Sequence, residues 1–202
     1  MNKEQVLKFL SNKNYGQYAS WALYDVSDEQ INNGKIEKKD VGFEPFKNNF
    51  KEKINFNGIF LALNCAARDI QVDDWSIFHD IRSMSQDYKI PYMIKNTKYE
   101  GSYMTDLFKG IHMTESDKFN EAIKKPENQS IYASSIASFQ EEYDLIKPEA
   151  IICFGGDVEK YLKRMIKKGE LKVDKEVNII RLTHYAHYMS IDGFKEQRNK
   201  LL

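Results

Sequence analysis

Polar residues of types that can act on a substrate follow apolar segments along this 202-residue chain. Asn64 ends the first such segment, Asp106 stands near the end of the second, Gly155 ends the third, and His184 follows the fourth with His187 three residues later. An amide can orient a water molecule, an ionised carboxylate can only accept hydrogen bonds, and a histidine can donate one near neutral pH. Each residue taken alone also fits a structural role, as a turn residue, a cap or a core histidine.

The four apolar segments have the length and composition of strands that are buried on both faces. They span residues 58–64, 101–108, 150–155 and 177–183, and the run is continuous rather than alternating in 58–64 and 150–155. Such runs are typical of parallel strands covered by helices. Ligands of open parallel sheets bind beyond the carboxyl ends of the strands, which is where the polar residues lie.

Segments with helical spacing of apolar residues alternate with these strands. They span residues 75–88, 131–146 and 158–166, and a last helix is expected over 190–202. Strands that alternate with helices favour parallel pairing with right-handed crossovers. The fold class predicted is therefore α/β: a three-layer α/β/α sandwich with a central, mainly parallel sheet of about four strands.

Residues 1–54 do not fit this alternation, and we expect them to form an N-terminal extension packed on a core of residues 55–202. The extension holds a cluster of aromatic residues, Tyr15, Tyr18, Trp21 and Tyr24. Packing in the core is the simpler interpretation of this cluster, and a surface on which bases stack is the alternative.

Composition excludes several classes of protein. Thirty Lys and Arg residues balance thirty Asp and Glu residues, which argues against a strongly basic protein that coats nucleic acid but permits a local basic face. The chain has no apolar stretch of about 18 residues and no signal peptide, so we expect no membrane partner. The two cysteines, Cys65 and Cys153, form no paired motif and are expected to be free thiols in the cytoplasm.

Cofactor motifs are absent from the sequence as well. It contains neither a Walker A motif nor a glycine-rich dinucleotide fingerprint, and no histidine pair has a compelling metal-binding pattern. We therefore expect no cofactor and no metal, and a monomeric protein.

Five segments, in this order, resemble the uracil-DNA glycosylase superfamily. They are residues 61–64 (LALN), 75–80 (WSIFHD), 103–110 (YMTDLFKG), 141–156 (EEYDLIKPEAIICFGG) and 181–188 (RLTHYAHY). The helical segment that ends in Lys-Pro before the third strand carries most of the resemblance, which covers about residues 55–190. It implies a glycosylase-like domain over 55–202 that hydrolyses the N-glycosidic bond of uracil, or of another deaminated or damaged base in DNA, during base excision repair.

The resemblance also assigns roles to single residues. It implies that Asn64 places the attacking water, that Phe78 stacks on a base flipped out of DNA, and that His184 stabilises negative charge on the departing base. His187 is the alternative to His184 in this role, and Gly155 is expected to line the substrate site.

Asp106 stands where the family reads the edge of the base with an asparagine. An asparagine both donates and accepts, which matches uracil, whereas an ionised aspartate would face uracil O4 with a lone pair. A base with an amino group, or a protonated Asp106, fits better. Two other functions stay open: a non-catalytic module of this fold that binds nucleic acid or a nucleobase, and an unrelated enzyme that acts on a small nucleoside.

Overall fold

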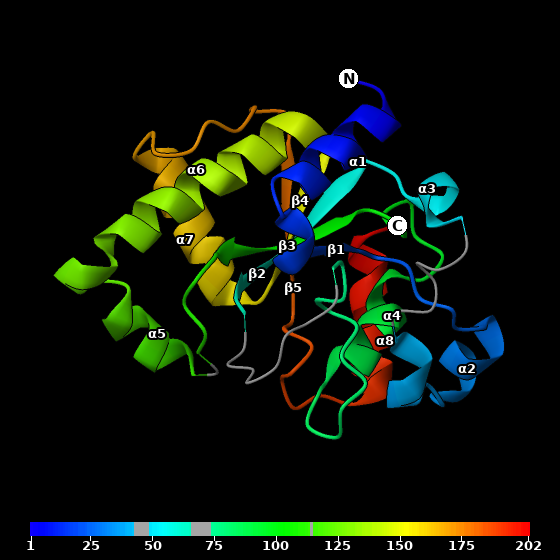
Figure 1. Ribbon diagram of the computed structural model, residues 1–202. Coiled ribbons are helices and arrows are strands. Elements are labelled where there is room, and N and C mark those ends of the chain that lie inside the picture. Colours follow the sequence, from blue (N-terminus) through cyan, green and yellow to red (C-terminus); the bar gives the residue numbers. More distant parts are fainter. Residues whose placement is uncertain (43–48, 66–73, 114) are drawn as a thin grey trace.

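The computed structural model describes residues 1–42, 49–65, 74–113 and 115–202 and contains a five-stranded central sheet (Figure 1). The strands are β1 (Ala19–Trp21), β2 (Gly58–Asn64), β3 (Tyr103–Phe108), β4 (Ala150–Phe154) and β5 (Asn178–Leu182). Their order is β1-β3-β2-β4-β5, with β2 to β5 parallel and β1 antiparallel to β3. The predicted α/β class and the four parallel strands are confirmed, and β1 adds an edge strand that was not predicted.

Helices cover both faces of the sheet and complete a three-layer sandwich (Figure 1). One face, here called the α6 face, carries α1 (Lys3–Asn12), α5 (Ser116–Ala122), α6 (Gln129–Ile146) and α7 (Gly156–Lys167). The other, the α8 face, carries α2 (Asp28–Asn33), α4 (Ile90–Ile94) and α8 (Ile191–Gln197). A short α3 (Phe50–Lys53) precedes β2. Within the described residues, no helix combines the length and the apolar character needed to span a bilayer.

The strands read as continuous apolar runs because each of their faces packs against a core. In β2, Ile59 and Leu61 join the core under the α6 face, whereas Phe60 and Ala62 join the core under the α8 face. Side chains of a strand alternate between the two sides of a sheet, so a strand buried on both sides needs an apolar residue at every position.

The N-terminal residues take part in both the sheet and the core. Ala19 pairs with Thr105 and Trp21 with Tyr103, and the buried ring of Trp21 lies 5.1 Å from that of Tyr103. Tyr15 and Tyr24 are buried as well, and only Tyr18 of the aromatic cluster reaches the surface. The cluster therefore serves the core, because most of its ring surface is removed from water.

The helices predicted over 131–146, 158–166 and 190–202 correspond to α6, α7 and α8, but the helix predicted over 75–88 is wrong. Trp75 and Phe78 have φ values of 66° and 70°, which a right-handed helix does not allow. The segment runs as turns, and a helical conformation begins only at residue 87. Met84, which the apolar stripe placed in the core, has a side chain that is 88% exposed.

Candidate functional site

A cavity of about 930 Å³ opens at the carboxyl ends of the parallel strands. The chain passes from β2 to β3 on one side and then returns to β4 on the other, so the strand order reverses beside β2. Such a reversal leaves a crevice where the connections diverge, and open α/β sheets bind their ligands there. Residues from the ends of β2, β4 and β5 and from the segment 77–87 line the cavity.

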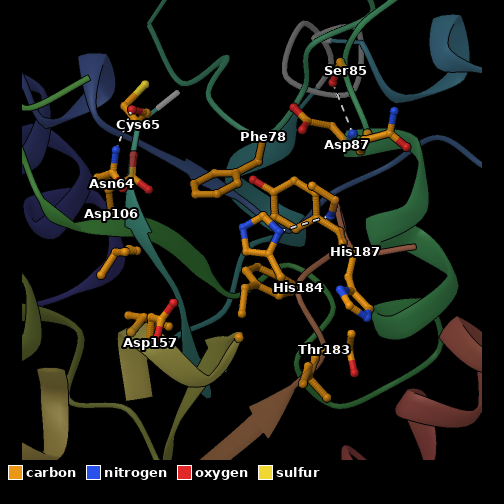
Figure 2. A pocket seen from close by; sticks show the side chains of 18 of the residues that line it. Asn64, Cys65, Phe78, Ser85, Asp87, Asp106, Asp157, Thr183, His184 and His187 are labelled. Carbon is orange, nitrogen blue, oxygen red and sulfur yellow. Dashed lines mark hydrogen bonds between the residues drawn. The ribbon is translucent and has the colours of Figure 1, made fainter. Parts of the chain in front are cut away.

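All six residues predicted for the site line this one cavity, although they come from five separate segments of the chain. They are Asn64, Phe78, Asp106, Gly155, His184 and His187. Figure 2 shows Asn64 and Asp106 on one wall, with Phe78 above and His184 facing them across the cavity. Their assembly follows from the parallel register, which brings the ends of the strands to the same edge.

The strand register sets the depth of each side chain. Asp106 pairs with Ala62, Leu61 with Cys153 and Phe154 with Leu182, so Asp106, Phe154 and Leu182 lie at one level, the inner level of the cavity. Asn64 stands two residues beyond Ala62 on the same face of the sheet. Two residues of a strand advance by about 7 Å, so Asn64 lies nearer the mouth than Asp106 by roughly that distance.

The amide of Asn64 is held in one orientation by backbone carbonyl groups. Its Nδ2 donates to the carbonyl oxygens of Met113 at 2.8 Å, Cys65 at 3.0 Å and Ile111 at 3.3 Å. An amide flipped by 180° would set Oδ1 against these oxygens, so the assignment is fixed by chemistry. Oδ1 has no hydrogen-bond partner among the described residues and can accept a hydrogen bond from a water molecule or a ligand.

His184 is held in one tautomer by the backbone. The N–H group of Ala186 donates to Nδ1 at 3.0 Å, so Nδ1 carries no proton and the neutral ring carries its proton on Nε2. Burial, with a smaller contribution from His187, lowers the pKa of His184 from 6.5 to about 4. Figure 2 shows the second ring nitrogen on the side that faces Asn64 and Asp106. At neutral pH the cavity therefore contains an uncharged imidazole whose Nε2–H is available as a donor.

Aromatic rings support the histidine and form part of the cavity wall. The ring of Tyr185 stacks on that of His184, with centroids 4.4 Å apart and planes at 24°. Phe154 and Phe78 approach the Tyr185 ring edge-on, at 5.3 Å and 6.4 Å. Tyr24 donates a 3.0 Å hydrogen bond to the carbonyl oxygen of Phe78 and so anchors the turn that carries this ring.

Gly155 lets the β4–α7 connection approach His184 closely. Its φ is 101°, in a region that L-residues with a side chain rarely enter, and a Cβ atom there would lie 3.4 Å from the Cβ of His184. Its N–H donates to the carbonyl oxygen of Leu182 at 2.9 Å, which ties the ends of β4 and β5 together. The glycine thus shapes the wall of the cavity through its backbone.

Asp106 and His187 occupy different parts of the cavity. Asp106 is 3% exposed, and the end of its strand is held by Lys109, which donates to the Asp106 carbonyl oxygen at 2.9 Å and pairs with the buried Glu142 at 2.6 Å. His187 is exposed, and Figure 2 places it on the side of His184 away from Asn64 and Asp106. This position leaves His184 as the histidine that faces the two predicted polar residues.

Several lining residues were not predicted from the sequence. The segment 80–87 contributes polar side chains, among them Arg82, which binds Asp80 through two nitrogens, and Asp87, which accepts from the Asp80 N–H. These residues were missed because the segment was interpreted as a helix. Asp157, in the first turn of α7, also lines the cavity. In the sequence, the position of Asp157 was indicated only by the Gly-Gly pair that precedes α7.

No group of three or more His, Cys, Asp or Glu side chains within the described ranges is arranged to hold a metal ion. Comparison of the sequence with protein-family models and with curated proteins finds no match.

Proposed function

We propose that this protein is a DNA glycosylase-like hydrolase that cleaves the N-glycosidic bond of a base flipped out of DNA. The observation that carries the proposal is the neutral His184, whose Nε2 faces Asn64 and Asp106 across a cavity at the strand-order reversal. Cleavage of this bond leaves positive charge on the sugar and negative charge on the base, so a catalyst needs a donor for the base and an oriented water for the sugar.

His184 is suited to stabilise the leaving base. A donor aimed at an oxygen that gains negative charge lowers the barrier by about 3 kcal/mol, which corresponds to a factor of 10² to 10³ in rate. The hydrogen bond from Ala186 commits Nδ1 as acceptor, so the proton on Nε2 is in place before the reaction starts. No reorganisation of the ring is needed as the charge develops.

Asn64 is suited to orient the attacking water. Its Nδ2 is committed to carbonyl oxygens, which leaves Oδ1 as the acceptor for a water proton. An amide does not take up the proton, so Asn64 acts by position rather than as a general base, and the proton that the water loses on adding to the sugar passes to the departing base anion. Because the sugar is already cationic in the transition state, a weakly activated water suffices to attack it.

Aromatic side chains are available to offset the cost of removing a base from its stack. That cost is a few kcal/mol, and each stacking contact returns about 1–3 kcal/mol. Phe78 lines the cavity, and Tyr188, in the loop that carries His184, is 99% exposed and free to stack on a neighbouring base. Arg82, Arg181 and Lys200 also line the cavity and can contact phosphates.

A non-catalytic module that binds a nucleobase is the second candidate. It is favoured by the lack of a titratable group at Asn64, since the same contacts can bind a base without activating water. We further propose a reducing, cytoplasmic location, because the two cysteines of the sequence form no paired motif.

Base release from oligonucleotides tests the proposal. Single- and double-stranded substrates would carry uracil, hypoxanthine, xanthine, cytosine or a G·U mismatch, and alkali would reveal abasic sites. We expect excision of at least one base, lowered 10² to 10³-fold by His184→Ala. His112→Ala, at an exposed histidine outside the cavity, is the matched control and should leave the rate unchanged. Salt-dependent binding without excision would instead support the binding module.

A further inference from the structure

Asp106 gives the cavity a chemical preference that can be derived from its position. This inference rests on the proposed function and concerns the base that the site accepts. We infer that the site selects a 2-oxo-4-aminopyrimidine, the cytosine class, over uracil and thymine, and that Asp106 is the residue that makes this choice.

The two ends of the cavity differ in hydrogen-bonding character. His184 presents a donor, because its Nδ1 is already an acceptor for Ala186. In its ionised form Asp106 presents a carboxylate, which has two oxygens and about four lone-pair positions, so it can accept from a ligand in addition to the contacts it makes within the protein. A complementary base must therefore carry an acceptor toward His184 and a donor toward Asp106.

Asp106 and His184 lie at different depths in the cavity. Asp106 and Leu182 lie at the inner level of the cavity. His184 follows Leu182 by two residues and therefore lies nearer the mouth than Asp106. A base that enters with its sugar at the mouth meets His184 close to the glycosidic bond and Asp106 at its far edge. In a pyrimidine, O2 lies next to the glycosidic nitrogen and the substituent at position 4 lies on the far edge. Purines have no carbonyl oxygen beside the glycosidic nitrogen.

The substituent at position 4 distinguishes the pyrimidines from one another. Cytosine carries an amino group at position 4, and a carboxylate that accepts from this group is an established pairing in base recognition. Uracil and thymine carry a carbonyl oxygen there, which would meet the carboxylate lone pair to lone pair. The surroundings of Asp106 increase the difference in affinity between cytosine and uracil. Asp106 is 3% exposed and shares the inner level with Phe154 and Leu182, so little water is available to separate its carboxylate from the uracil oxygen.

A matched set of variants tests the inference. Excision of cytosine, 5-methylcytosine, uracil and thymine from otherwise identical single-stranded oligonucleotides would be measured for the wild type, Asp106→Asn and Asp157→Asn. Asparagine adds a donor and removes the charge, so Asp106→Asn should shift the cytosine-to-uracil rate ratio toward uracil by roughly 5- to 150-fold. Asp157→Asn removes the same charge from the same cavity at a partly exposed side chain, and should leave the ratio unchanged.

Calorimetric titration measures the affinity for free cytosine and free uracil and does not require catalysis. It is made on the wild type first. Tighter binding of cytosine by the wild type, reversed in Asp106→Asn, supports the inference even if no base is excised. Excision of uracil in preference to cytosine, abolished by His184→Ala, overturns it and leaves the proposed function standing. An unchanged ratio in a folded Asp106→Asn also overturns it. Failure to bind or cleave any of these bases overturns the inference, and it overturns the proposed function as well if hypoxanthine and xanthine are not excised either.

Discussion

The buried histidine beside Phe78 allows a quantitative prediction about acid stability. His79 is 4% exposed, with Nδ1 3.0 Å from the carbonyl oxygen of Val41 and Nε2 3.2 Å from that of Trp21. Burial lowers its pKa from 6.5 to about 4, against the opposing effect of the two carbonyl groups. A neutral ring can donate to only one of the two oxygens, whereas an imidazolium could donate to both.

The sign of the effect follows from which state binds the proton more tightly. The unfolded chain takes up a proton on this histidine near pH 6.5, whereas the folded protein resists it until about pH 4. The contribution to stability is therefore complete above pH 6.5 and is lost as the pH falls toward 4. At pH 5, the interval of about 1.5 pH units below 6.5 corresponds to a loss of about 2 kcal/mol.

Urea unfolding at pH 7.5 and pH 5, followed by tryptophan fluorescence, measures this loss. Trp21 and Trp75 are buried and should report the transition. His79→Gln keeps a donor but does not titrate, so its free energy of unfolding should fall by about 2 kcal/mol less than that of the wild type between the two pH values. The difference between the proteins cancels the contribution of His184, whose pKa is lowered in the same direction. Equal losses in the two proteins would refute the reasoning and mean that His79 is protonated in the fold, donating to both carbonyl groups.

Three further substitutions distinguish residues that stabilise the fold around the site from a residue that contacts the ligand. Gly155→Ala places a side chain at φ 101° against His184 and should cost about 1–3 kcal/mol of stability in thermal denaturation, with slower excision. Glu142→Ala leaves the buried ammonium of Lys109 without its carboxylate, and should cost about 3–5 kcal/mol in chemical denaturation. Tyr188→Ala should change stability by less than about 0.5 kcal/mol yet weaken binding of oligonucleotides, measured by fluorescence anisotropy. Stability loss in Tyr188→Ala, or none in the other two variants, would contradict these roles.

The parallel strands and the residues at their ends were predictable because both depend on burial and order along the chain. β2 is the predicted segment 58–64 without change, and β4 differs from 150–155 by one residue. Once the strands are parallel, their carboxyl ends must share an edge, so Asn64, Asp106 and His184 had to lie near one another. Their relative depth could not be predicted, because it requires the register.

The segment 75–88 shows why the remainder could not be predicted. Trp75, Ile77 and Phe78 are buried as the apolar stripe required, but the stripe records burial and not backbone conformation. Here burial is achieved by turns with positive φ at Trp75 and Phe78, stabilised by partners distant in the sequence, such as the Tyr24 hydroxyl. Edge strand β1 escaped prediction for a related reason, because three residues are too few to show a periodic pattern.

The candidate site combines strand ends with turns, and these two parts differ in how they are held and in how they respond to acid. The wall formed by Asn64, Asp106 and Gly155 belongs to strand ends that the sheet register holds in place. The wall formed by Phe78 and His184 belongs to turns that a few specific contacts hold, chiefly the bonds of His79 and of Ala186. Protonation acts on the second wall, since a proton on His184 Nδ1 removes the bond from Ala186 and frees the ring to rotate. Loss of the site in acid should therefore begin at the turns while the sheet remains intact.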